Sequence, residues 1–206
     1  IEFDITGQYL VYDSYNELSS TTGEDIGYWD IGIINVWDNN ANDWGNGYIS
    51  KLYGSLPEDV SIGNPVFSKN SPWIIAFDYI DAANNQYAIL GADLNTGHDN
   101  LITMNNTLGY PSFSKNDDRI AFMKNDGVSQ SIYTIGLGAD KISPVGTESK
   151  IIPDAKWPVF FAIGERNLSL PPIADFTVDV KTGNAPLQVK FFDLSANQPS
   201  SWAWTF

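Results

Sequence analysis

The sequence predicts an all-β chain that is built from a repeated unit and ends in a β segment of a different kind. Residues 64–80, NPVFSKNSPWIIAFDYI, recur at residues 110–126 as YPSFSKNDDRIAFMKND, which places Phe67 and Phe113 46 positions apart. Turn-forming Gly, Pro, Asn and Asp residues interrupt the apolar runs, and no long amphipathic helical pattern occurs. A fixed period of this length is typical of repeat architectures.

Each copy of the repeat has the same local pattern. A proline opens a strand at a position that needs no ladder donor, an aromatic residue follows, and a polar turn leads into a short apolar run. Residues 3–15, FDITGQYLVYDSY, form a third copy, in which Phe3 and Tyr12 are nine positions apart, like Phe113 and Phe122. We therefore expect six equivalent buried anchors: Phe67, Phe77, Phe113, Phe122, Ile75 and Ile120.

This repeat resembles the TolB-type, WD-like β-propeller unit, whose pattern is P-x-F/W-S-P-D-G-x-x-I-A-F. Residues 113–117, FSKND, stand in for F-S-P-D-G, and Asp117 replaces a glycine in a turn where Asp is also tolerated. The middle copy has one extra turn residue and places Pro72 in the turn. Residues 93–97, DLNTG, match the second half of the family's unit. The resemblance implies a partial β-propeller of three to four blades over residues 1–166.

The spacing also predicts where the blades differ. From Phe3 to Phe67 is 64 positions, and we expect the roughly 18 extra residues to form polar loops at residues 16–27 and 38–47. Return strands are expected at residues 101–103 and 141–143, and a fourth, shortened hairpin at residues 153–163.

The pattern changes after a proline-containing linker at residues 167–171. Residues 172–206 contain the blocks P-x-A-x-F, G-x-x-P-L-x-V-x-F-x-D-x-S and W-x-W-x-F, in which Leu187, Val189 and Phe191 share one strand face. These blocks resemble the start of a PKD domain. That resemblance implies a truncated immunoglobulin-like β-sandwich, because a whole sandwich has about 100 residues.

The composition excludes several classes of function. The net charge is −14, from 25 acidic and 11 basic residues, so we expect neither nucleic-acid nor anionic-membrane partners. The chain has no cysteine, and no apolar run reaches membrane-spanning length. Because the first residue is Ile and no signal peptide precedes it, we expect a processed or trimmed piece.

The residues offer little catalytic chemistry. His98 is the only histidine and lies in a polar turn, and the sequence contains no G-x-S-x-G elbow, P-loop or G-x-G-x-x-G motif. With 25 acidic residues, adjacent carboxylates are expected by chance. We assign no catalytic residue and expect a non-enzymatic protein.

Two kinds of site remain as predictions. Asp38, Asn40 and Asn42 place oxygen ligands at alternate positions, as at the start of a calcium loop, although the expected glycine is Asp43; an Asn-rich turn is the alternative. No other cofactor is expected. Glycosylation sequons begin at Asn105 and Asn167.

The two resemblances imply an archaeal or bacterial cell-surface protein of the S-layer type, extracellular or secreted, with a structural or adhesive role. Its expected partners are other surface proteins, copies of itself, or cell-surface glycans. The alternative is an accessory binding region of a secreted enzyme that degrades polysaccharide or peptide. A sugar-binding surface would present a flat exposed row of tryptophans, and a scaffold would bury them; the candidates are Trp29, Trp37, Trp44 and Trp73.

Overall fold

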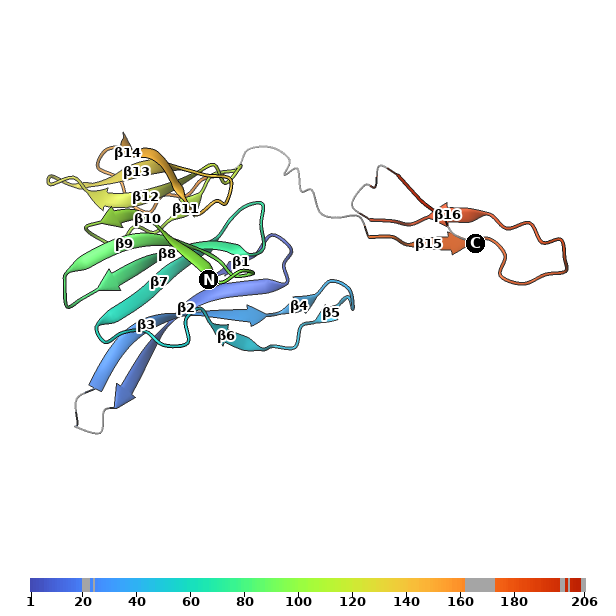
Figure 1. Cartoon of the computed structure of the whole chain (residues 1–206), viewed down its shortest axis with the longest axis horizontal. Coiled ribbons are helices and arrows are strands. Elements are labelled where there is room, and N and C mark those ends of the chain that lie inside the picture. The colour runs from blue at the N-terminus through green and yellow to red at the C-terminus, as the bar shows by residue number, and fades with distance from the viewer. Residues whose placement is uncertain (20–22, 24, 162–172, 197–198, 200, 205–206) are drawn as a thin grey trace. The chain divides into compact units, whose positions relative to one another are not determined.

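The structure, a computed structural model, describes residues 1–19, 23, 25–161, 173–196, 199 and 201–204. The chain divides into two compact units, residues 1–163 and 164–206. The described residues form strands and turns without a helix, and the first unit contains three four-stranded sheets side by side (Figure 1). The chain is therefore all-β, as the sequence predicts.

Each four-stranded sheet is an antiparallel meander that corresponds to one propeller blade. The first strands of neighbouring blades contact each other, so they form the inner edge of the partial propeller. Blade 1 contains β1 (Glu2–Phe3), β2 (Tyr9–Ser19), β3 (Asp25–Asn35) and β6 (Ile49–Lys51). Blade 2 contains β7 (Val60–Phe67), β8 (Ile74–Asp81), β9 (Gln86–Asp93) and β10 (His98–Asn105). Blade 3 contains β11 (Ser112–Phe113), β12 (Arg119–Asn125), β13 (Gln130–Leu137) and β14 (Pro144–Ile152).

The predicted anchors are buried, with side chains exposed by at most 1%. They pack between blades because a sheet with one apolar face must cover it with the next sheet. One cluster joins blades 1 and 2 around Phe67 and Phe77. A second joins blades 2 and 3 around Phe113 and Phe122. The repeat alignment is thus confirmed at all six positions, whereas Phe3, at the start of the first copy, is 56% exposed.

The entries to blades 2 and 3 and the segment after blade 3 use a left-handed residue before a proline. Asn64, Tyr110 and Trp157 have φ values of 49°, 49° and 55°, and each precedes a proline. Trp157 lies 47 positions after Tyr110, so a further copy of the repeat begins there. The expected hairpin at residues 153–163 is not formed in its described part, residues 153–161. Phe160 instead packs on the outer face of blade 3.

The second strand of a blade holds the next blade through a carboxylate. Asp13 of blade 1 accepts a hydrogen bond from the backbone N–H of Asn64 at 2.9 Å. Asp78, the equivalent residue of blade 2, accepts bonds from Gly109 at 2.7 Å and Tyr110 at 3.0 Å. Blade 3 has Met123 at this position, in an apolar cluster. Burial raises the pKa of Asp78 to about 6, although these hydrogen bonds oppose the shift.

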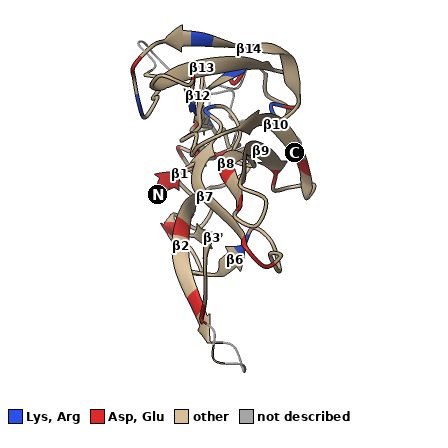
Figure 2. Cartoon of the chain, turned by 90° about the vertical axis from the view of Figure 1, so that its left-hand side faces the viewer, with Lys and Arg blue, Asp and Glu red and all other residues tan. Residues whose placement is uncertain are grey.

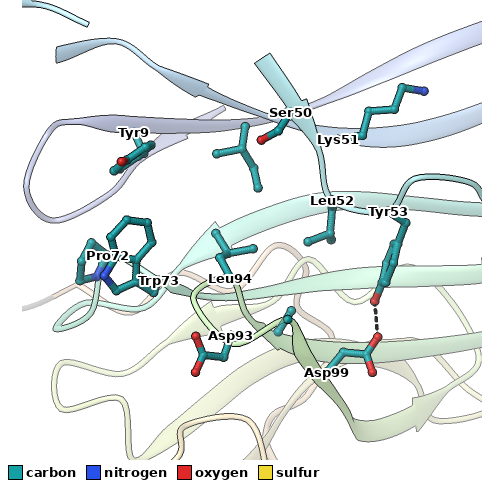
Figure 3. A pocket seen from close by; sticks show the side chains of 13 residues that line it. Tyr9, Ser50, Lys51, Leu52, Tyr53, Pro72, Trp73, Asp93, Leu94 and Asp99 are labelled. Atoms are coloured by element: carbon teal, nitrogen blue, oxygen red, sulfur yellow. Dashed lines mark hydrogen bonds between the residues drawn. The ribbon is translucent and has the colours of Figure 1, made fainter. Parts of the chain in front are cut away.

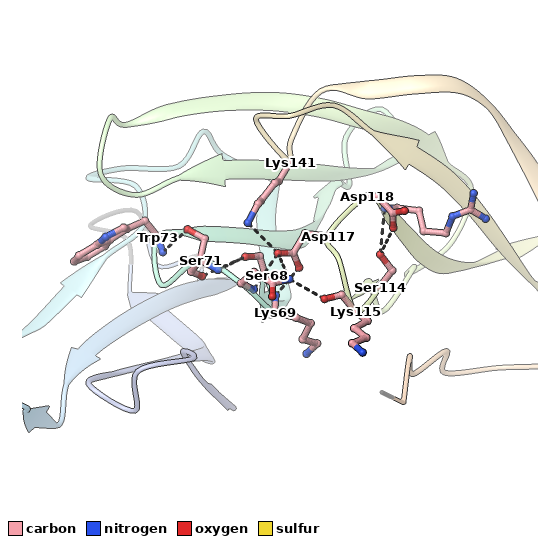
Figure 4. A network of polar contacts seen from close by, with 11 residues as sticks. Ser68, Lys69, Ser71, Trp73, Ser114, Lys115, Asp117, Asp118 and Lys141 are labelled. Atoms are coloured by element: carbon pink, nitrogen blue, oxygen red, sulfur yellow. Dashed lines mark hydrogen bonds and ion pairs between the residues drawn. The ribbon is translucent and has the colours of Figure 1, made fainter. Parts of the chain in front are cut away.

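The buried carboxylate of Asp117 connects the turns of blades 2 and 3 through hydrogen bonds (Figure 4). Asp117 adopts a φ of 56°, as its place at a glycine position of the repeat predicts. Its side chain accepts the backbone N–H groups of Lys69 and Asn70 at 2.5 and 2.9 Å. The ammonium of Lys141 lies 3.0 Å from the same carboxylate. The substitution of glycine by aspartate therefore adds a contact between blades.

Three local expectations for the blades are wrong. Residues 16–27 are not mainly a loop, because β2 and β3 pair continuously from Tyr9↔Asn35 to Ser19↔Asp25. Residues 38–47 contain all but the first residue of a small hairpin, in which β4 (Trp37–Asp38) pairs with β5 (Asp43–Trp44). The return strand of blade 3 is β14, so residues 141–143 belong to the preceding turn. Strand pairing thus continues into polar stretches that the sequence pattern predicts to be loops.

The second unit is a small all-β element that leaves its apolar residues exposed. β15 (Phe176–Val178) pairs with β16 (Phe191–Asp193). Trp204 packs against Phe176 and Phe191 with ring centroids 5.4 Å apart in both cases. These three rings remain 40–54% exposed. The predicted linker at residues 167–171 lies outside the described residues.

Candidate functional site

A hollow of about 320 Å³ lies between blades 1 and 2 (Figure 3). One wall comes from β2, β3 and the segment after β6. The opposite wall comes from the turns that precede β8 and follow β9. The hollow is mainly apolar, with aromatic and carboxylate side chains at its margins. The residues used below are Tyr9, Ile33, Leu52, Tyr53, Trp73, Asp93, Leu94 and Asp99.

An aromatic pair forms one end of the hollow. The rings of Tyr9 and Trp73 lie 5.2 Å apart at an angle of 53°. Trp73 follows Pro72, in the turn that carries one more residue than the other copies. Its carbonyl accepts a hydrogen bond from Leu94 at 2.7 Å, which fixes its backbone to the other turn. The indole is held in place but stays 38% exposed.

A hydroxyl–carboxylate pair forms the other end. The hydroxyl of Tyr53 donates to Asp99 at 2.7 Å. Burial raises the pKa of Tyr53, and the bond to Asp99 raises it further, so the phenol stays protonated and remains a donor. The ring also packs edge-on against Phe77, at 6.2 Å between centroids. This contact with a buried anchor fixes the position of the carboxylate.

The equivalent space between blades 2 and 3 is filled. There, the longer turn before β14 folds inward and buries Ile142, which is 1% exposed. A methyl group added at Gly91 would lie 2.7 Å from the Ile142 side chain, so the two elements are in close contact. In blade 2, a tight turn follows β9 instead, and Asp93 stabilises it by accepting a hydrogen bond from the N–H of Asn95 at 2.9 Å. The shorter turn leaves the hollow between blades 1 and 2 open.

The charge around the hollow is negative. Asp93 and Asp99 both line it. The lysine among the lining residues, Lys51, is paired with Asp30 at 2.7 Å, and that pair raises the pKa of Lys51. Figure 2 shows most lysine and arginine positions around β12, β13 and β14, and few near the strands of blade 1. The hollow therefore presents aromatic faces, aliphatic surface and hydrogen-bond acceptors.

Apart from Trp73, which is a candidate for a sugar-binding row, the residues of this site are not predicted by the sequence. Pro72 and Trp73 depart from the repeat pattern, and that departure is the signal that marks the turn. Tyr53 and Asp99 carry no local signal, because they come from different blades and meet only through the packing of the sheets.

The residues of the predicted calcium loop lie at the tip of the β4–β5 hairpin. One oxygen of Asp38 accepts the N–H groups of Asn40 and Ala41, at 2.8 and 3.1 Å. Asn42 has a φ of 51° and is exposed, as is Asn40. This is the hydrogen-bonding pattern of an Asn-rich turn. Calcium binding at Asp38, Asn40 and Asn42 stays a prediction.

His98 and the first predicted glycosylation site, Asn105, do not line the hollow. His98 is exposed at the start of β10. The side-chain nitrogen of Asn105 donates to the carbonyl of Met123 at 2.9 Å, so the atom that glycosylation would use is engaged in the fold. The second sequon, at Asn167, lies outside the described residues.

The four candidate tryptophans form neither a flat row nor a buried set. Trp29 is 44% exposed and packs on Tyr15 near the tip of the β2–β3 hairpin. Trp44, 79% exposed, packs edge-on against the half-buried Trp37 in the β4–β5 hairpin. Trp73 lies at the hollow. Their distribution over three places does not fit a single planar sugar platform.

Comparison with known proteins identifies the fold. No family model matches the chain, and no curated protein sequence matches it. Among solved structures, the chain is similar to TolB from Acinetobacter baumannii, with a TM-score of 0.51 and 16% identity over 95% of this chain and 41% of that one. It is also similar to the β-propeller domain of the Trilobed protease from Pyrococcus furiosus, with a TM-score of 0.46 and 12% identity over 91% of this chain and 54% of that domain's chain.

The chain is thus an all-β protein with a partial β-propeller. More particularly, the propeller is TolB-like, and it spans less than half the length of the TolB structure it matches. Among the described residues, no helix is long and apolar enough to cross a membrane.

Proposed function

We propose that this chain is a non-enzymatic, extracellular protein-binding module of the cell surface, with a structural or adhesive role. The observation that carries the proposal is the hollow between blades 1 and 2, where Trp73 and Tyr9 present aromatic surface beside aliphatic side chains. Partly exposed aromatic residues around an apolar depression are typical of protein-interaction sites. The absence of a single tryptophan platform among the described residues supports protein rather than planar glycan contact.

The buried carboxylates support a non-enzymatic role. Asp78 and Asp117 are almost fully buried, and each accepts several hydrogen bonds from the neighbouring blade or turn. Carboxylates that act in catalysis lie in clefts that substrate can reach. These two are used to join blades. The single histidine, His98, lies on the surface.

The assignment to the cell surface rests on the combination of modules. The second unit keeps the sequence blocks of a PKD domain, and its aromatic residues Phe176, Phe191 and Trp204 cluster on one side of a two-stranded sheet. A TolB-like propeller next to such a unit is the arrangement that implies an S-layer-type or other surface protein. The net charge of −14 also favours a solvated, exposed location.

The alternative function is an accessory binding region of a secreted enzyme that degrades polysaccharide or peptide. The exposed Trp44 and Tyr48, at 79% and 70%, favour this alternative, because aromatic side chains on a projecting hairpin suit glycan contact. Binding of oligosaccharides that is lost in Trp44→Ala but kept in Trp73→Ala would support it.

A site-specific cross-linking experiment tests the protein-binding role. A photoreactive residue is placed at position 73 in the complete protein on intact cells, and at position 17 as a control. Glu17 is exposed on β2 and does not line the hollow. We expect a defined surface protein to be cross-linked from position 73 but not from position 17, and excess free module to compete. Equal labelling from both positions would contradict the proposal, and protection of the protein from added protease until the cells are broken would contradict a surface location.

A further inference from the structure

We propose that the hollow between blades 1 and 2 binds a lysine or arginine side chain from a basic segment of the partner protein. This inference rests on the proposed function, since it assumes that the module binds a protein. It adds the chemical nature of the group that is bound. The proposal is carried by the shape of the hollow, its acceptor-rich margin and the comparison with the filled space between blades 2 and 3.

The size and lining of the hollow fit one long side chain with an apolar stem. Its volume is about 320 Å³. Ile33, Leu52 and Leu94 supply aliphatic surface, and Figure 3 shows Leu52 and Leu94 between the aromatic end and the Tyr53–Asp99 end. Lysine and arginine bury their methylene stems against such surface and keep the charged group at a polar margin. Between blades 2 and 3, Ile142 occupies the corresponding space. An aliphatic side chain can therefore be accommodated at this position of a blade interface.

The margin of the hollow favours a positively charged group. Asp99 uses one oxygen for Tyr53, and Asp93 uses one for the turn, which leaves the second oxygen of each carboxylate available for another donor. The faces of Tyr9 and Trp73 attract a cation through the ring quadrupole. A cation at the Tyr53–Asp99 end would gain the interaction with the carboxylate, and the stem of the same side chain would extend over Leu52 and Leu94 toward the aromatic end.

No cation of the chain itself takes this place among the described residues. Lys51 lines the hollow, but its ammonium contacts Asp30 at 2.7 Å and approaches the ring of Tyr28. In blade 3, by contrast, Lys141 comes from the turn after β13 and neutralises the buried Asp117. The corresponding turn after β9 contains no lysine or arginine. The negative margin is thus left for an external cation.

A neutral sugar is the competing occupant, since it would also stack on Trp73. A sugar needs donors as well as acceptors, and the margin offers mainly acceptors. The two ligands are distinguished by charge and by salt dependence.

The test uses NMR titration of the protein with four pentapeptides, each with two glycines on either side of a central lysine, arginine, glutamine or norleucine. Methyl glucoside is the fifth probe. The indole N–H signal of Trp73, assigned with a Trp73→Phe variant, reports binding. We expect saturable shifts with the lysine and arginine peptides, weakened by salt, and at least about tenfold weaker binding of the glutamine and norleucine peptides.

Three variants sharpen the test. Asp99→Asn keeps the shape and the bond from Tyr53 while removing the charge, and should weaken lysine-peptide binding about three- to thirtyfold. Trp73→Phe, followed through backbone amide signals because it lacks the indole, should weaken it less, because an aromatic face remains. Glu17→Gln removes one charge elsewhere and should leave binding unchanged. An unfolded Asp99→Asn protein would be recognised by lost dispersion of its NMR spectrum, and Asp93→Asn would then serve in its place.

Each outcome has a defined meaning. Equal binding of all four peptides, or an equal loss in Glu17→Gln, overturns the proposal. Binding of methyl glucoside but not of the basic peptides assigns the hollow to sugars and also overturns it. If the peptides fail to bind while cross-linking from position 73 still captures a partner, the cation proposal is wrong and the protein-binding role stands. If both fail, the proposed function fails as well.

Discussion

The two blade interfaces have equivalent anchors but different fillings. Between blades 2 and 3, Ile142 from a long turn closes the space, and Asp78 and Asp117 clip the blades together. Between blades 1 and 2, the core around Phe67 is equally buried, but the turn after β9 is short and a hollow remains. The repeat therefore determines the core, while the connections between strands determine whether a site is left open.

The largest expected effect comes from removing a shared anchor. Phe113→Ala should lower the free energy of unfolding by about 3–5 kcal/mol, because a fully buried ring leaves a cavity between two rigid sheets. Urea unfolding monitored by circular dichroism measures the loss. Val128→Ala, at a site 95% exposed, is the control and should change little. A loss below about 1 kcal/mol for Phe113→Ala would mean that the blades do not share this core.

Truncating Ile142 should make the interface between blades 2 and 3 resemble the open interface between blades 1 and 2. Ile142→Ala should cost about 2–5 kcal/mol in unfolding free energy, because the side chain contacts β9 near Gly91. The equivalent truncation at the open interface, Leu52→Ala, should cost less, since Leu52 is only half-buried beside an existing hollow. Equal losses in the two variants would show that the interfaces are filled to the same extent.

The carboxylate between blades 2 and 3 predicts a pH dependence. The pKa of Asp78 is about 6 in the folded protein, against 3.8 for an unperturbed aspartate, so the folded state holds its proton more tightly than the unfolded chain. Its contribution to stability is therefore complete below pH 3.8 and is lost as the pH rises through 6. The difference of about 2 pKa units corresponds to about 3 kcal/mol.

Comparing the wild type with Asp78→Asn isolates this effect, because the amide stays neutral. The wild type should lose about 2–3 kcal/mol relative to the variant between pH 4 and pH 7, measured by urea unfolding at each pH. A constant difference across this range would show that the carboxylate is already charged at pH 4.

The smallest expected effect concerns the ion pair at the first interface. Glu2 contacts the ammonium of Lys69 at 2.7 Å and accepts the N–H of Phe67 at 3.1 Å. Glu2→Gln should cost no more than about 1 kcal/mol, because both side chains are partly exposed and the amide oxygen still accepts a hydrogen bond. Salt should reduce the difference between the two proteins. A cost above about 2 kcal/mol would mean that this pair, rather than the core, holds blades 1 and 2 together.

The sequence alone determined the repeat, its anchors and the left-handed turn at Asp117. The 46-residue spacing between Phe67 and Phe113 identifies equivalent strands because each blade must bury the same face against its neighbour. Asp117 at a glycine position correctly indicates a left-handed turn. These features depend on short-range patterns, which a single sequence carries directly.

Only the tertiary structure decided where the polar stretches pair and which interface stays open. Residues 16–19 and 25–27 extend the β2–β3 hairpin because the register continues, although their composition is typical of a loop. Tyr53 and Asp99 belong to different blades, and Ile142 lies in a turn whose inward direction no periodicity predicts. The hollow exists because two sheets meet with a short turn between them, and that is a property of packing across the fold rather than of any one segment.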